Sequence, residues 1–169
     1  MFGDSADCYR HCGAGLRHTR AMRIYLPVTL TELTDPAGVS PRQGRAVTPP
    51  LRTALGDGTD EETAEFAALV LAGEDSLGLL AEADPARRVV AAADVPDAQV
   101  RTGEELAGVA VPAIVWSQVV SFHADEDDDG VRQLVSAARR GEQRAQEQVA
   151  DLDLLWYDVS EREVLAGEG

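Results

Sequence analysis

The chain contains no lysine and no asparagine, and only two isoleucines among its 169 residues. These three amino acids have AT-rich codons, so their scarcity points to a GC-rich genome. The two cysteines, Cys8 and Cys12, both lie near the N-terminus, so the body of the chain has no disulfide framework and no cysteine nucleophile. With His11 and His18 they have a spacing that fits no zinc pattern, because the adjacent His11 and Cys12 would crowd the metal.

The sequence also lacks a long apolar run and the apolar core of a signal peptide. A membrane-spanning helix needs about 20 consecutive apolar residues, so we expect no span and a cytoplasmic location. All 15 basic residues are arginine, against 30 acidic residues, and the formal net charge is -15. Because this charge repels phosphate and no basic stripe offsets it, the composition argues against nucleic acid and anionic membranes as partners.

The hydrophobic content of 44% is typical of a folded chain, and the length suits one domain. Residues 1–21 are polar and glycine-rich without periodicity, so we predict a disordered N-terminal extension there. A single α+β domain is expected over residues 22–165, followed by a frayed tail at 166–169.

Strand patterns recur along this domain. Four strands are predicted, over residues 22–28, 87–93, 115–123 and 154–159. Residues 116–118 fit a helical turn equally well. Residues 98–111 match no single pattern, although a short strand fits at 109–111. Residues 35–47 are rich in proline and glycine and are typical of a loop.

Helix signals lie between the first two and between the last two strands. Thr48 caps a short helix, and Thr59 with Glu62 forms a capping box for a longer one. The apolar stripe of the longer helix is Phe66, Val70, Gly73, Leu77 and Leu80. A further helical stripe begins after Gly130, and Gly141 kinks or splits it.

This order of elements is the βαββαβ signature of a ferredoxin-like α+β sandwich. One-sided stripes predict an antiparallel sheet with the helices packed on one face. The rival is another α+β sheet with a helical insertion between the first two strands.

Five segments of the domain read, in order, MRIYLPVTL, AVTPPLR, RRVVAAADVPD, VSFHADE and LLWYDVSE. In this order they resemble an uncharacterised actinobacterial family, known as a domain of unknown function. The resemblance extends from about residue 22 to residue 164. It supports Met22 as the natural start and implies no activity, ligand or catalytic residue.

An acidic run follows the third predicted strand. Asp125, Asp127 and Asp129, with Gly130, match the first half of an EF-hand calcium loop. The match fails at the twelfth loop position, where Ser136 stands in place of a bidentate glutamate. A simpler interpretation is that the run caps the next helix and complements its dipole.

His123 is the only histidine beyond the first twenty residues. With Asp125 and Glu126 it forms a candidate metal or general-base site, and because a catalytic metal usually has three protein ligands, Asp94 is the candidate third. The structural alternative is a histidine at a strand end, hydrogen-bonded or half exposed. No nucleotide, dinucleotide or hydrolase motif occurs in the sequence.

The aromatic residues Tyr25, Trp156 and Tyr157 form a candidate partner surface. Alternation places Trp156 and Tyr157 on opposite faces of the last strand, so one belongs to the core and the other faces solvent, a pocket or a partner. We therefore expect a small non-enzymatic domain that acts through protein–protein or self association. The alternative is a metal-binding protein or metal-dependent enzyme that uses His123 and Asp125, with a divalent metal as the one cofactor considered.

Overall fold

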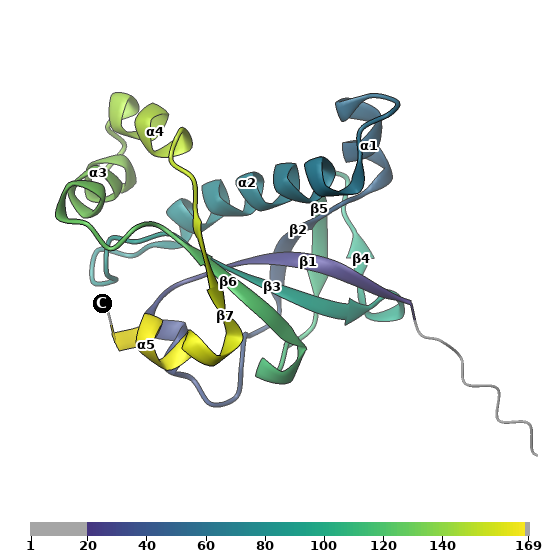
Figure 1. The fold of residues 1–169 in the computed structure, drawn as a ribbon, viewed down its shortest axis with the longest axis horizontal. Coiled ribbons are helices and arrows are strands. Elements are labelled where there is room, and N and C mark those ends of the chain that lie inside the picture. The colour runs from purple at the N-terminus through teal and green to yellow at the C-terminus, as the bar shows by residue number, and fades with distance from the viewer. Residues whose placement is uncertain (1–19, 168–169) are drawn as a thin grey trace, which may run out of the picture.

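Seven strands form one antiparallel sheet in this computed structural model, which describes residues 20–167. The sheet order is β4-β5-β2-β1-β3-β6-β7, so β1 is central and β4 and β7 are the edges (Figure 1). The strands are β1 (Ala21–Val28), β2 (Arg42–Ala46), β3 (Val89–Pro96), β4 (Arg101–Thr102), β5 (Gly108–Val111), β6 (Val119–Ala124) and β7 (Leu155–Asp158). The helices are α1 (Pro49–Leu55), α2 (Glu61–Leu79), α3 (Asp129–Arg139), α4 (Gln143–Ala150) and α5 (Arg162–Gly167).

The antiparallel α+β class is confirmed, but the ferredoxin-like βαββαβ order is wrong for this seven-stranded sheet. β2 lies inside residues 35–47, which were predicted to be a loop, and β4 and β5 occupy the ambiguous residues 98–111. These strands extend the sheet on the side of β1 away from β3.

Gly44 explains why β2 looks like a loop in the sequence. A Cβ at this position would lie 2.9 Å from Leu26 Cδ2 and 3.0 Å from the carbonyl oxygen of Tyr25. Gly44 pairs with Val109 of β5, so it stands inside the sheet. Glycine is therefore used here for close contact with β1 and not for a turn.

β1 is buried on both faces. Ile24, Leu26 and Val28 have no solvent exposure, as their alternation predicts, and Tyr25 on the other face is 5% exposed. The strand pairs with β3 along its whole length, from Ala21 opposite Pro96 to Val28 opposite Val89.

The helix α2 packs on one face of the sheet, where it contacts β1, β2 and β3. Its buried residues are small: Ala64, Ala68, Ala72, Gly73 and Ser76. Phe66 and Val70 are 54% and 38% exposed, so the predicted stripe is wrong at these two positions. The fully buried residues of α2 are therefore small, and they fit against larger side chains such as Tyr25 and Val90 of the strands.

The start of α2 also differs from the prediction. Asp60 is the N-cap, and its carboxylate accepts the N–H of Thr63 at 2.7 Å. Thr59, the predicted cap, instead donates from its hydroxyl to the carbonyl of Gly56 at 3.1 Å. The shorter helix α1 starts as predicted, because Thr48 accepts the N–H of Leu51.

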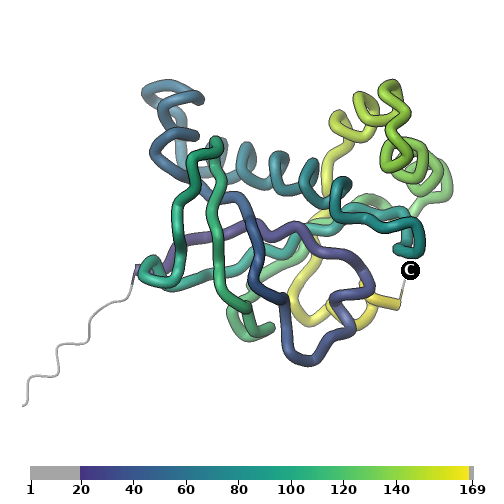
Figure 2. Tube along the Cα trace, turned by 180° about the vertical axis from the view of Figure 1, so that it is seen from behind, coloured from purple at the N-terminus to yellow at the C-terminus, as the bar shows by residue number. Residues whose placement is uncertain are grey.

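The other face of the sheet is covered by residues 29–41 and by α5. Leu30, Leu33 and Leu165 pack there in the main hydrophobic core with Leu26 and Phe122. Figure 2 shows residues 29–41 and the C-terminal segment together, on the side opposite α2. Helices therefore pack on both faces, and the prediction of a one-sided helical layer is wrong.

The helices α3 and α4 form a separate lobe beside the C-terminal end of α2 (Figure 1). Gly141, with φ of 89°, separates the two helices, as predicted. Asp128 caps α3 by accepting the N–H groups of Gly130 and Val131. No helix within residues 20–167 is both long and apolar enough to cross a membrane.

The predicted terminal segments fall mainly outside the described residues. Residues 1–19, including the Cys8, His11, Cys12 and His18 group, are not described, and Ala21 already belongs to β1. At the other end α5 runs to Gly167, and residues 168–169 are not described.

Candidate functional site

His123 lies on the face of β6 that also carries α2. Its ring is edge-on to the ring of Tyr25, with the centroids 6.5 Å apart, and its Nε2 lies 3.4 Å from the Ser121 hydroxyl. Burial lowers the pKa of His123, and the positive charge of Arg23 lowers it further. The imidazole is therefore neutral at neutral pH, half-buried and placed beside polar neighbours near the end of its strand.

Tyr25 lies beneath α2 and not on the outer surface. Burial raises the pKa of Tyr25 to about 12, and the negative charge of Glu65 contributes to the increase. The phenol therefore remains protonated at neutral pH. With 5% exposure, Tyr25 adds no area to the predicted partner surface.

Asp125 is committed to a buried ion pair with Arg88. The Arg88 guanidinium donates from Nη2 to Oδ1 at 2.7 Å, and the Arg88 main-chain N–H donates to Oδ2 at 2.7 Å. The two side chains are 4% and 0% exposed. Both carboxylate oxygens therefore accept hydrogen bonds from Arg88, so Asp125 is held in a structural ion pair.

Asp94, the candidate third ligand, pairs with Arg23 instead. Arg23 donates from Nε to Oδ1 at 2.6 Å and from Nη2 to Oδ2 at 3.2 Å. His123 is opposite Val90 in the β3–β6 ladder, and Asp94 is further along β3 by about 13 Å. The structure therefore does not bring His123 and Asp94 together.

The remaining acids of the run surround the start of α3. Asp127 and Asp129 both pair with Arg132, and Glu126 is exposed. Within residues 20–167, no three His, Cys, Asp or Glu side chains are grouped closely enough to hold a metal ion. The acidic run thus matches the capping interpretation.

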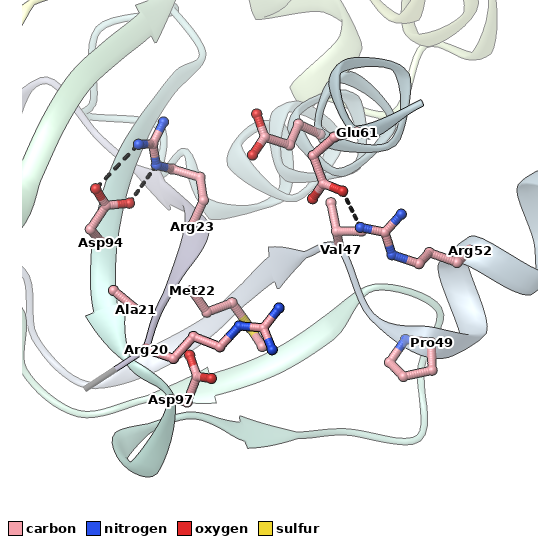
Figure 3. A pocket seen from close by; sticks show the side chains of 11 residues that line it. Arg20, Ala21, Met22, Arg23, Val47, Pro49, Arg52, Glu61, Asp94 and Asp97 are labelled. Carbon is pink, nitrogen blue, oxygen red and sulfur yellow. Dashed lines mark hydrogen bonds and ion pairs between the residues drawn. The ribbon is translucent and has the colours of Figure 1, made fainter. Parts of the chain in front are cut away.

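A polar cavity of about 580 Å³ opens beside the first residues of β1 (Figure 3). The ion pair Arg23–Asp94 lines one wall, and Arg52–Glu61 lines the other. Both guanidinium groups are therefore already bound to carboxylates. Among the described residues, every buried side-chain nitrogen or oxygen has a hydrogen-bond partner.

A smaller apolar cavity, about 190 Å³, lies between α2 and the segment that enters β7. A Cβ built on Gly73 would lie 3.3 Å from Leu154 Cδ1, which shows how closely the two segments approach. Glu74 and Asp153 add negative charge to the lining, and its one cation, Arg88, is paired with Asp125. The apolar side chains around it are Phe66, Leu69, Val70, Leu152 and Leu154.

Trp156 extends this apolar surface along β7. Its indole is 60% exposed, and it pairs across the strands with His123, on the same face as Leu154. Tyr157 points to the opposite face, where it packs against the main core and its hydroxyl accepts a hydrogen bond from Arg87 Nη2 at 2.7 Å. The prediction that the two aromatic residues lie on opposite faces is confirmed, with Trp156 exposed and Tyr157 half-buried against the core.

The residues 22–166, which carry this surface and nearly all of the sheet, match DUF6912, a family of unknown function. The chain belongs to DUF6912. The match confirms the predicted resemblance to a domain of unknown function, and it starts at Met22. No curated protein and no solved structure matches the chain.

The DUF6912 domain has one exposed main-chain edge next to Trp156. Asp125 donates its N–H to the carbonyl of Arg88, toward β3. Successive residues of a strand point their main-chain groups to opposite neighbours, so those of Phe122 and Ala124 in β6 point to β7. Their partners in β7 are Tyr157 and Leu155. The N–H and C=O of Trp156 therefore point outward, and no described residue bonds to them.

The sequence pattern of this DUF6912 domain did not predict which residues of α2 are exposed. The predicted stripe assigned Phe66 and Val70 to the core, although they border the apolar cavity. A signal was present, because Ala64, Ala68, Ala72 and Ser76 recur every fourth residue and form a stripe of small side chains.

Proposed function

We propose that this DUF6912 protein is a non-enzymatic binding module that engages another protein, or a second copy of itself, through the surface at β7. That surface, the β7 surface, consists of Phe66, Val70, Leu154 and Trp156. The main observation behind this proposal is that Trp156, on an edge strand, is 60% exposed. Tryptophan is among the residues most enriched at the energetic centres of interfaces.

The neighbouring polar groups support binding over catalysis. Asp125 and Asp94 are each held by an arginine, and the pKa of His123 is lowered by burial. A general base is most effective when its pKa is close to the operating pH and its proton-accepting atom faces a substrate. Phe66, Val70 and Leu154 instead line an apolar cavity on the same face as Trp156, beside an open strand edge, as at docking sites for proteins.

Site-specific photo-cross-linking tests this proposal. A photoreactive amino acid replaces Trp156 in the full-length chain, and the protein is irradiated in the cells that produce it. The matched control carries the same group at Val164 in α5, which is 62% exposed and lies across the sheet from α2. We expect a discrete cross-linked adduct from position 156 and none from position 164.

Light scattering over a dilution series identifies the self-associated form, because a homodimer dissociates on dilution. The variant Trp156→Ala is compared with Val164→Ala, and only the first is expected to shift the equilibrium. A chain that is monomeric at every concentration and gives no adduct at position 156 contradicts the proposed function.

A further inference from the structure

We infer that β7 accepts an extended basic segment of a partner protein as an additional strand of the sheet, with an apolar side chain of that segment in the cavity beside α2. The inference rests on the proposed function, because it specifies the partner of the same surface. Main-chain geometry, charge and shape each support it.

The main chain supplies the first argument. The outward N–H and C=O of Trp156 form a donor–acceptor pair of the kind that an incoming strand completes. At the next outward position, the N–H of Asp158 is already bonded to Glu161 Oε2 at 2.7 Å. Pairing is therefore centred on Trp156 and ends where β7 ends.

Charge selects a basic partner. The segment around β7 is strongly acidic, and its single cation, Arg162, stacks on the ring of Trp116 with its Cζ 4.7 Å from the ring centroid. A partner carrying arginine or lysine is attracted to this edge, whereas a second copy of a chain with net charge -15 is repelled. The acids of this segment are Asp151, Asp153, Asp158, Glu161 and Glu163.

The shape of this surface indicates which side chains of the partner segment are apolar. The side chains of an added strand alternate between the two faces of the sheet, so every second one lies on the α2 face beside Trp156. The apolar cavity next to Leu154 has a volume of about 190 Å³ on that face. The matching segment therefore alternates apolar residues with basic ones.

The probe is a short fluorescent peptide of alternating arginine and valine, blocked at both ends, titrated against the full-length chain by fluorescence anisotropy. We expect saturable binding that weakens as salt is added. Two control peptides isolate the causes: in one, glutamate replaces arginine, and in the other, every central main-chain nitrogen is methylated. Neither control is expected to bind.

Variants of the protein test whether the peptide binds at β7. Glu163→Gln, in the acidic segment on the face opposite the cavity, is expected to weaken binding about two- to fivefold, while the exposed Glu104→Gln at the opposite end of the sheet leaves it unchanged. Trp156→Pro removes the outward N–H as well as the indole. It is expected to bind about two- to tenfold more weakly than Trp156→Ala, which removes the indole alone.

The outcomes separate this inference from the proposed function. An adduct at position 156 together with equal binding of the arginine peptide and its methylated form overturns strand addition and leaves the binding module intact. Equal binding of the glutamate peptide overturns the charge argument. Absence of both peptide binding and any adduct overturns the inference and the proposed function together.

Discussion

The carboxylate of Asp125 receives both the guanidinium and the main-chain N–H of Arg88, and the two side chains are 0% and 4% exposed. Removal of one charge leaves the other buried without its partner. We expect Asp125→Asn to lower the free energy of unfolding by about 3 to 5 kcal/mol, measured by urea denaturation.

The double variant Arg88→Met, Asp125→Leu is the control for this ion pair. It removes both charges and keeps apolar volume, so its loss of stability is expected to be smaller than that of Asp125→Asn. A double variant as unstable as the single one contradicts the assignment of the loss to an uncompensated charge.

The direction of the β7 main chain gives a paired proline prediction. Leu155→Pro removes an N–H that points to β6 and leaves an acceptor on Ala124 unpaired, so we expect a loss of about 1 to 3 kcal/mol. Trp156→Pro removes an outward N–H and is expected to be clearly less destabilising. Thermal unfolding of both variants measures the difference. The reverse ranking would mean that the N–H of Trp156, and not that of Leu155, bonds to β6.

Because small residues of α2 are buried and a large one is exposed, enlarging Ala68 is expected to destabilise the protein more than replacing Phe66 by a polar residue. Ala68 has no solvent exposure against the sheet, so Ala68→Leu overpacks this layer and is expected to cost about 1 to 3 kcal/mol. Phe66 is 54% exposed, and Phe66→Ser is expected to change stability by less than about 0.5 kcal/mol. Chemical denaturation measures both, and a larger loss for Phe66→Ser would show that α2 is rotated from the position described.

His123 makes stability depend on pH. Burial and the charge of Arg23 hold its pKa in the folded chain below the ordinary value of 6.5, so the unfolded chain binds more protons between the two pKa values. The contribution of His123 is complete above the unfolded pKa and is lost as the pH falls through 6.5 toward the folded pKa.

His123→Gln is therefore expected to reduce the loss of stability between about pH 7.5 and about pH 5.5, measured by urea denaturation. The amide cannot take up a proton, and the other titrating groups stay the same in both proteins. An unchanged pH dependence, or an NMR titration of His123 with a pKa above 6.5, would show that the ring is not desolvated as described.

Elements with strong local signals were predictable from the sequence. The alternation of Ile24, Leu26 and Val28 identified β1, the Thr48-Pro49 start identified α1, and Gly141 marked the break between α3 and α4. Each signal lies in consecutive residues and depends on no distant part of the chain.

The missed elements depend on their neighbours in space. The sequence around Gly44 predicts a loop because the close contact with Leu26 is not visible there. Likewise, the apolar size of Phe66 favoured burial, while the face of α2 that meets the sheet has room only for residues such as Ala68.

In the candidate site, too, local patterns were predictable from the sequence and contacts between distant residues were not. Alternation correctly placed His123 near the end of a strand and separated Trp156 from Tyr157. The pairing of Asp125 with Arg88 joins residues 37 positions apart, and no local pattern reports it. The open edge of β7 also depends on the whole sheet order, which the βαββαβ interpretation had wrong.

The complete burial of Leu165 in the main core has a consequence for protein synthesis. The ribosome delivers the chain from its N-terminus, so β1, β2 and β3 emerge well before α5. Until α5 arrives, the part of the apolar face that Leu165 covers is exposed to water and open to aggregation or to chaperones. The last helix of this domain in chain order therefore completes the core, and folding reaches completion only after nearly the entire domain has emerged.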